Sequence, residues 1–235
     1  MSSIDIILPC YNPHHNWMDK VIISSHSLRE KLRGDDLRIL VVNDGSVTGI
    51  NTEDVKLLKE KIPFLDYCEY KINRGKGYAV RKGAELSQAD ILLYTDIDIP
   101  YAEESVFEMI EQIKANQADI LFGVRDEEYY SHVPSSRKLV SKMLKRFTSL
   151  LIRIPIIDTQ CGLKGFNRKG KEILLKTTID RYLFDMEFIC LAARDKNIRY
   201  KPFVIKTDPN SVFSSLSAKI LLRESWNFFK LIWRF

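Results

Sequence analysis

Two aspartates separated by one residue follow directly after a short apolar stretch. Residues 91–94 read Ile-Leu-Leu-Tyr, and Thr95, Asp96, Ile97 and Asp98 come next. If the strand continued regularly, both carboxylates would point to one face, where their like charges repel and one tends to take a proton. A divalent cation removes that conflict, and hard oxygen ligands suit Mg²⁺ or Mn²⁺, which also hold phosphate oxygens. The pair therefore predicts a metal–diphosphate site at a strand end, and the alternative is a solvated turn with two exposed acids.

Two further segments combine glycine with polar side chains where strands are expected to end. Residues 43–46 read Asn-Asp-Gly-Ser, in which Asp44 can accept hydrogen bonds from a nucleobase or a ribose hydroxyl and Gly45 allows close approach to the backbone. The alternative is a turn whose Asp or Ser caps the next helix. Residues 73–77 read Asn-Arg-Gly-Lys-Gly, and their cations at an expected helix N-terminus suit phosphate oxygens. The alternative there is a cationic turn.

The second half of the chain carries a basic segment. Residues 129–157 contain no acidic residue. Arg137 and Ser141 lie four residues apart, which places them on one face if this segment is a regular helix. Together with Arg125 they can hold a further anion, and the alternative is a solvated basic face.

Two acids, Asp185 and Glu187, stand at the start of another expected helix. They can serve only as favourable charges at the positive end of the helix dipole. The alternative is that one of them acts as a base or binds an acceptor.

Short apolar segments alternate along the chain with segments of helical spacing. The expected strands cover residues 4–8, 37–42, 67–72, 91–95, 119–124 and 200–206, and a loop over 158–162 leads into residues 163–166. The expected helices cover 17–32, 53–61, 78–88 and 103–115, with two more beginning at 168 and 184. This alternation predicts an α/β fold with a mainly parallel central sheet and helices on both faces. Ligands of such sheets bind beyond the carboxyl ends of the strands, so the polar segments there should meet in one crevice. These segments are residues 9–12, 43–46, 95–98 and 123–125.

Length and composition indicate one large globular domain with a small appendage. The 235 residues are 45% hydrophobic, and the net charge of +5 is too mild to indicate a partner, so no nucleic acid is expected. We expect a domain over residues 1–210, with halves 1–125 and 126–210, and a helix over 211–235. The four cysteines lack zinc-site spacing and indicate free thiols in a reducing cytosol. Neither a secretory signal nor a membrane-spanning helix is expected.

The expected C-terminal helix is basic, aromatic and amphipathic. Its polar stripe recurs at steps of three and four residues and consists of Lys219, Arg223, Asn227, Lys230 and Arg234. The remaining surface is apolar and includes two tryptophans. The helix can dock on the domain, or it can lie in a membrane interface with its cations facing lipid phosphates.

Taken together, these motifs follow one another in a specific order. They are Pro9-x-Tyr11-Asn12, Val41-Val42-Asn43-Asp44-Gly45-Ser46, Asn73-x-Gly75-Lys76-Gly77-x-Ala79-Val80, Asp96-x-Asp98, Gly123-x-Arg125 and Asp158-x-Gln160-Cys161-Gly162-x-Lys164. This order closely resembles the family 2 inverting glycosyltransferases, which have a GT-A fold. Within that family the chain is most similar to the polyprenyl-phosphate branch, the dolichyl-phosphate mannose or glucose synthases. The resemblance covers roughly residues 4–206.

The resemblance implies a role for each matching position. On the donor side, it implies that the nucleotide sugar is bound by Pro9, Tyr11, Asn12, Asp44, Gly45, Lys76 and Asp96. It implies that Asp96 and Asp98 bind Mg²⁺ or Mn²⁺, with Asp98 as the direct ligand. On the acceptor side, it implies contacts from Arg125, Arg137, Ser141, Asp158 and Gln160. The implied catalytic set is Asp96, Asp98, Arg125, Arg137, Asp185 and Glu187.

Two positions depart from the family pattern. Pro13 stands where members often carry Glu, and Pro100 stands where lipid-phosphate enzymes often carry Gln as a further residue of the metal site. These departures leave the donor base and sugar open between GDP-mannose and UDP-glucose types. The chain also lacks the membrane-spanning segments that many relatives carry after this domain, and the C-terminal helix can replace them as a peripheral anchor.

The resemblance implies transfer of a hexose from a nucleotide-diphosphate sugar to polyprenyl phosphate, on the cytoplasmic face of a membrane. A phosphate acceptor is already an anion and needs cations rather than a strong base. A sugar-hydroxyl acceptor is the alternative, and it would need Asp185, Glu187 or Asp158 as general base. A second alternative is a non-catalytic nucleotide-binding module at the membrane. A membrane-protein partner or a second copy of the chain is left open.

Overall fold

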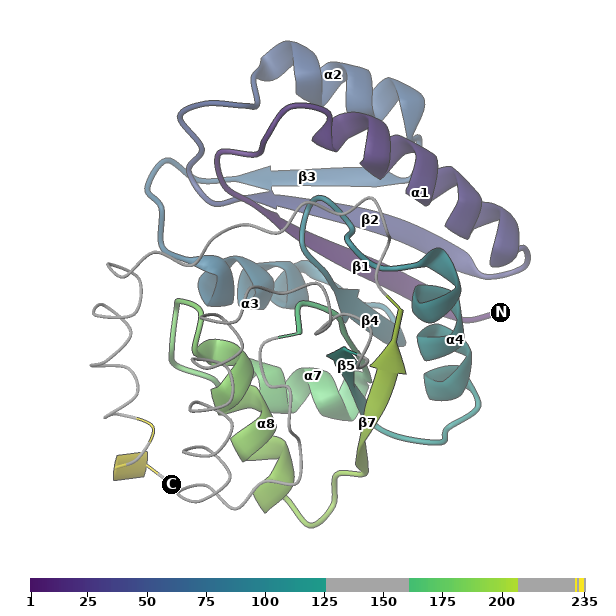
Figure 1. Ribbon diagram of the computed structural model, residues 1–235, viewed down its shortest axis with the longest axis vertical. Helices are drawn as coiled ribbons and strands as arrows, with labels where there is room; N and C mark the ends of the chain where they lie inside the picture. The colour runs from purple at the N-terminus through teal and green to yellow at the C-terminus, as the bar shows by residue number, and fades with distance from the viewer. Residues whose placement is uncertain (126–160, 207–230, 232, 235) are drawn as a thin grey trace, which may run out of the picture.

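The computed structural model describes residues 1–125, 161–206, 231, 233 and 234. In these residues the chain forms a seven-stranded sheet in the order β3-β2-β1-β4-β6-β5-β7 (Figure 1). The strands are β1 (Ser3–Cys10), β2 (Asp36–Asn43), β3 (Leu65–Glu69), β4 (Ile91–Tyr94), β5 (Ile120–Arg125), β6 (Lys164–Asn167) and β7 (Tyr200–Ile205). β6 pairs antiparallel with β4 and β5, and the other pairs of this sheet are parallel. The predicted mainly parallel sheet is confirmed.

Helices cover both faces of the sheet, as the continuous apolar strands predict. They are α1 (Trp17–Lys31), α2 (Thr52–Lys61), α3 (Lys76–Leu86), α4 (Glu103–Lys114), α7 (Arg168–Leu175) and α8 (Phe184–Arg194). Within β1, Ile6 belongs to the core cluster that contains residues of α1, α2 and α4. The next residue, Ile7, belongs to the opposite cluster, with residues of α3, α7 and α8. Side chains of a strand alternate between faces, so the two layers of core follow directly from the strand geometry.

Two element boundaries differ from the prediction. β3 covers Leu65–Glu69 rather than residues 67–72, because its partner β2 ends where Asn43 pairs with Glu69. Helix α3 begins at Lys76 rather than at residue 78. Gly75 precedes it with a φ of 116°, a conformation that glycine adopts without steric cost. Lys76 therefore lies in the first turn of the helix.

The carboxyl ends of β1, β2, β4 and β5 lie at one edge of the sheet, as predicted. The first three strands are parallel neighbours, and the backbone N–H of Asp44 donates to Cys10 O at 2.7 Å where β1 and β2 end. β5 runs in the same direction, because the strand between β4 and β5 is antiparallel to both. The N–H of Gly123 donates to Leu163 O at 3.0 Å, so β6 begins at the edge where β5 ends.

The described part of the C-terminus lies against the domain. Leu231 is buried in the core cluster of α3, α7 and α8, whereas the side chain of Trp233 is 89% exposed. Leu231, Trp233 and Arg234 are helical, and the rest of the predicted helix over 211–235 falls outside the described residues. Among the residues that the structure describes, no helix has the length and apolar character needed to cross a membrane.

Candidate active site

The two aspartates that follow β4 lie on a turn. β4 ends at Tyr94, and the N–H of Ile99 donates to Asp96 O at 3.0 Å, which closes the turn. The expectation that a continuing strand points Asp96 and Asp98 to one face is therefore wrong. Ile99 has a φ of 41°, which a β-branched residue rarely adopts, and Pro100 follows it. Such backbone strain is common at functional sites.

Lys76 reaches Asp96 from the first turn of α3. Its Nζ lies 2.6 Å from Asp96 Oδ1, and the Asp96 side chain remains 41% exposed. Burial raises the pKa of Asp96, but the positive charges of Lys76, Lys164 and Arg125 outweigh burial and hold that pKa below its usual value. Burial disfavours the charged form of Lys76 as well and so lowers its pKa, but the charges of Asp96 and Asp185 raise that pKa above its usual value. Both groups of this pair are charged at neutral pH.

Of the two aspartates that follow β4, Asp98 is the one for which nearby positive charges do not outweigh burial. Burial and the charge of Asp96 raise the pKa of Asp98. No group of three or more His, Cys, Asp or Glu side chains suited to a metal occurs in the described parts of the chain. Asp96 and Asp98 are both partly exposed, which fits Mg²⁺ or Mn²⁺, because these ions commonly bind through one or two carboxylates together with phosphate oxygens and waters. The donor set therefore fits a divalent cation that arrives with a diphosphate.

A second ion pair is buried behind the first. Lys164 Nζ lies 2.6 Å from Asp185 Oδ1, and the side chains are 0% and 5% exposed. The hydroxyl of Tyr94 donates to the same oxygen at 2.6 Å, and the Lys164 ammonium also donates to Cys161 O. Sequence reasoning missed the role of Lys164. The signal was a lysine in the segment Leu163–Phe166, between apolar residues, because a charge buried there requires a partner.

Gly162 lies against the Asp96 carboxylate. A Cβ at this position would overlap Asp96 Oδ2 and would lie 2.8 Å from the Tyr101 hydroxyl oxygen. The N–H of Gly162 donates to that hydroxyl at 2.7 Å. Gly162, just before β6, therefore lies so close to the turn that carries Asp96 that a side chain at this position would overlap the Asp96 carboxylate.

Replacing Gly162 with alanine is expected to lower the turnover number about 100-fold, because displacing a reacting group by about 1 Å has an effect of this size. The added methyl group overlaps Asp96 Oδ2, so the side chain that pairs with Lys76 has to shift. Steady-state kinetics measures the loss. Gly34→Ala controls for a general loss of stability, because its φ of 100° strains any side chain although a Cβ there meets nothing within 4 Å. Equal turnover numbers for the two variants would contradict the assignment.

Asp44 holds the loop that precedes α3. Its carboxylate is buried and accepts hydrogen bonds from Asn73 Nδ2 at 2.7 Å and from the N–H groups of Arg74 and Gly75, both at 2.8 Å. Gly45 has a φ of 71°, and a Cβ there would lie 2.8 Å from Asn73 N. The amides of Arg74 and Gly75 therefore already have an acceptor, and the contribution of the loop to a phosphate site comes chiefly from Lys76.

The loop after β1 interlocks with the loop after β2. The N–H of Asn12 donates to Ser46 Oγ at 2.9 Å, and Asn12 Oδ1 accepts from the N–H groups of Val47 and Thr48 at 2.9 and 3.2 Å. The Tyr11 side chain is 50% exposed beside them. Two of the four polar segments predicted to meet, residues 9–12 and 43–46, are therefore in contact at this edge of the sheet.

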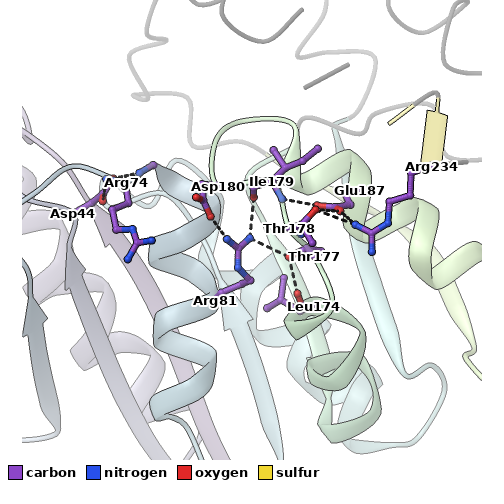
Figure 2. A network of polar contacts seen from close by, with 11 residues as sticks. Asp44, Arg74, Arg81, Leu174, Thr177, Thr178, Ile179, Asp180, Glu187 and Arg234 are labelled. Atoms are coloured by element: carbon purple, nitrogen blue, oxygen red, sulfur yellow. Dashed lines mark hydrogen bonds and ion pairs between the residues drawn. The ribbon is translucent and has the colours of Figure 1, made fainter. Parts of the chain in front are cut away.

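Glu187 is buried in the first turn of α8. Its carboxylate accepts from the N–H groups of Thr178 and Ile179, both at 2.8 Å, and from Thr178 Oγ1 at 2.9 Å. Arg234 completes this set with an ion pair to the same carboxylate (Figure 2). The structure thus gives both Asp185 and Glu187 partners within the protein.

The remaining predicted residues divide into two groups. Pro9 lies in β1 and Arg125 at the end of β5, both near the carboxyl edge. The predicted acceptor residues Arg137, Ser141, Asp158 and Gln160 fall outside the described residues.

Comparisons with known proteins identify relatives of the whole described domain. The family model described as Glycosyl transferase family 2 matches residues 5–174. Glycosyltransferase AglD from Haloferax volcanii is 25% identical over 208 residues, which cover 88% of this chain and 33% of that protein. The dolichyl-phosphate beta-glucosyltransferase of Saccharomyces cerevisiae is 27% identical, over 82% of this chain and 63% of that enzyme. A dolichyl-phosphate beta-glucosyltransferase of Trichomonas vaginalis is 30% identical, over 82% of this chain and 62% of that enzyme. The chain thus spans from a third to just under two thirds of these relatives.

Two solved structures share the fold. The mannosyltransferase PcManGT from Pyrobaculum calidifontis, solved with GDP-Man and Mn²⁺, superposes with a TM-score of 0.57 at 18% identity, over 86% of this chain and 55% of that one. Mannosyl-3-phosphoglycerate synthase from Rubrobacter xylanophilus superposes with a TM-score of 0.61 at 14% identity, over 99% of this chain and 73% of that one. At these identities the likeness describes the arrangement of the strands and helices.

Proposed function

Because the chain belongs to glycosyl transferase family 2 and has the predicted GT-A fold, we propose that it transfers a hexose from a nucleotide-diphosphate sugar to polyprenyl phosphate. The observation that carries the proposal is the cluster of Asp96, Asp98 and Lys76 at the carboxyl edge of the sheet. Relatives named for glucosyl transfer to dolichyl phosphate support the choice of acceptor.

On the donor side, the half formed by residues 1–125 binds the nucleotide sugar. Tyr11, Asn12 and Asp44 surround the nucleoside, and Lys76 lies beside the diphosphate. When bound at Asp96 and Asp98, Mg²⁺ or Mn²⁺ supplies Lewis-acid neutralisation of the departing diphosphate. The Mn²⁺ and GDP-Man in the Pyrobaculum structure support this choice of cofactor and of donor class.

On the acceptor side, residues 126–210 position the lipid phosphate. An oxygen of that phosphate forms a bond to C1 of the hexose on the face opposite the diphosphate. The bond from C1 to the diphosphate oxygen breaks, and its electron pair stays on the diphosphate, so that the anomeric configuration inverts. Arg125 and Arg137 hold and orient the acceptor anion, with Ser141, Asp158 and Gln160 around it.

No general base is needed for this reaction, because the acceptor phosphate is already an anion. We infer that Asp185 and Glu187 are structural partners of Lys164 and Arg234 rather than bases. An acceptor hydroxyl would require one of these two acids, or Asp158, as its base, and Asp185 or Glu187 would have to take the proton within a buried ion pair. The lipid acceptor supports a location at a membrane surface, for which we propose the cytoplasmic face, and the exposed Trp233 can contact lipid there.

The direct test supplies radiolabelled GDP-mannose or UDP-glucose with Mn²⁺ and polyprenyl phosphate in detergent. We expect label in the organic phase only when the polyprenyl phosphate is present. Label transferred only to soluble glycans would support the hydroxyl acceptor instead. Nucleotide binding without transfer to either acceptor would support a non-catalytic module.

Replacing Arg137 with alanine is expected to raise the KM for polyprenyl phosphate about 10- to 100-fold, because hydrogen bonds to charged groups contribute about 1.5–3 kcal/mol. The KM for the nucleotide sugar should change little. Lys138→Ala is the matched control, since on a regular helix it points about 100° away from Arg137. A rise in the donor KM alone would show that the residue acts on the other substrate.

A further inference from the structure

Arg234, the second-last residue of the chain, forms an ion pair with a buried carboxylate. Glu187 is 1% exposed, and an ionised carboxylate in that position requires a cation. The Arg234 guanidinium contacts Glu187 Oε1, donates from Nη1 to Thr178 Oγ1 at 3.0 Å, and reaches Lys176 O from Nη2 at 3.4 Å. Arg234 therefore binds both Glu187 and the loop formed by residues 176–181, which we call the bridging loop.

Glu187 fixes the backbone of the bridging loop from the other side. Its oxygens accept the N–H groups of Thr178 and Ile179, two consecutive residues in the middle of the loop. An unpaired carboxylate would be driven toward water or toward its neutral form, and either change weakens these acceptors. The cation on Glu187 therefore determines how firmly the bridging loop is held.

The bridging loop also contacts α3, along the first half of the helix. Arg81 of this helix donates to Thr177 Oγ1 at 3.2 Å and to Ile179 O at 2.8 Å, and it forms an ion pair with Asp180 (Figure 2). The N–H of Tyr78 donates to Asp180 O at 3.1 Å. The helix and the loop are thus joined by several polar contacts along one side.

Glycines allow this contact to be close. A Cβ on Gly75 would overlap Asp180 O, and a Cβ on Gly77 would lie 2.6 Å from Ile179 O. The backbone of the bridging loop is therefore the surface against which the first turn of α3 is placed. Lys76 lies between these two glycines, and its ammonium reaches Asp96.

We infer that Arg234 is a positioning residue for Lys76, acting through Glu187 and the bridging loop. This inference rests on the proposed function only in that Lys76 serves the donor diphosphate. It gives the last residues of the chain a role in the donor site, through the contacts of Arg234 with Glu187, Thr178 and Lys176.

Hydrogen exchange of the full chain tests the coupling without any ligand. In Arg234→Met, which keeps the length of the side chain and removes its charge, peptides covering residues 176–181 and 74–80 should exchange about tenfold faster or more. A reference peptide over α2 should keep its wild-type rate. The matched control is Trp233→Ala, whose side chain is exposed on the same segment. Faster exchange in 176–181 alone, or equally in α2, would overturn the inference.

Rescue distinguishes positioning from general loss of stability. Adding Glu187→Gln to Arg234→Met removes the unpaired charge but keeps an oxygen that can accept a backbone N–H. The double variant should return exchange in residues 74–80 most of the way to the wild-type rate. If the two substitutions instead add their effects, the carboxylate–guanidinium pair is not what places α3.

Nucleotide binding separates this inference from the proposed function. Titrating GDP and UDP, each with Mn²⁺, into the wild-type chain should show binding of one of them. Arg234→Met should weaken that binding about 2- to 30-fold, the usual range for residues that act at a distance. If neither nucleotide binds the wild type, the proposed function fails, and the exchange rates alone decide the inference. If one binds both proteins equally, the inference fails and the proposed function stands.

Discussion

Replacing Asp98 with alanine is expected to lower transfer about 1000-fold at saturating donor and acceptor, because a Lewis acid contributes several kcal/mol of charge stabilisation. Asp98 is the carboxylate whose pKa is raised by burial and by the charge of Asp96. It therefore gains most from a divalent cation, whereas Asp96 already has Lys76 as a partner. The measurement is the rate of transfer from radiolabelled donor across a range of Mn²⁺ concentrations.

The matched control for this variant is Asp36→Ala. Asp36 is an exposed aspartate at the amino end of β2, on the edge of the sheet opposite to the site. Its replacement should leave turnover unchanged. If Asp98→Ala retains wild-type turnover, or if added Mn²⁺ has no effect on the wild-type protein, the metal site at this turn is ruled out.

Replacing Lys164 with methionine is expected to lower the free energy of unfolding by about 3–5 kcal/mol, because it leaves the carboxylate of Asp185 buried without its cation. Lys164 is fully buried between β4 and β5, so water cannot easily replace it. Total stabilities are typically about 5–15 kcal/mol, so the loss should be evident as a lower urea midpoint. The same variant should also weaken donor binding, since Lys164 helps to keep Asp96 ionised.

Two further variants test the origin of this loss. Adding Asp185→Asn to Lys164→Met removes the unpaired charge and should recover much of the stability. Arg168→Met is the control for an exposed pair, because Arg168 and Asp90 are 69% and 49% exposed, and it should change stability by about 0.5 kcal/mol or less. Similar losses for the exposed and buried pairs would show that burial is not the cause.

Much of the fold follows from the sequence because apolar strands and helical spacing alternate without interruption. The patterns placed β1, β2, β4 and β5, and they predicted that the polar ends of these strands meet. They did not predict that β6 inserts antiparallel between β4 and β5. Periodicity indicates which residues are buried, but β6 reads only Lys-Gly-Phe-Asn, and so short a segment carries no pattern that gives its direction.

The site was predicted less completely than the fold. The pairing of Asp96 with Asp98 and the position of Lys76 near them could be proposed from local motifs. The partner of Lys164 could not, because Asp185 is 21 residues away and the contact depends on how β6 and α8 pack. A turn at the two aspartates was the stated alternative, but the positive φ of Ile99 was not predicted, since it runs against the local preference of a β-branched residue.

The antiparallel direction of β6 has a consequence for how this protein could be altered. β5 ends and β6 begins at the same edge of the sheet, where Gly123 and Leu163 are hydrogen-bonded. The chain therefore leaves the described framework after Arg125 and re-enters it at Cys161, at nearby points of this edge, with residues 126–160 inserted between them in the sequence. Such an insertion can be exchanged as a unit while the strands and the Asp96 turn stay in place. Grafting the corresponding segment from a relative with another acceptor would be a direct route to a modular transferase.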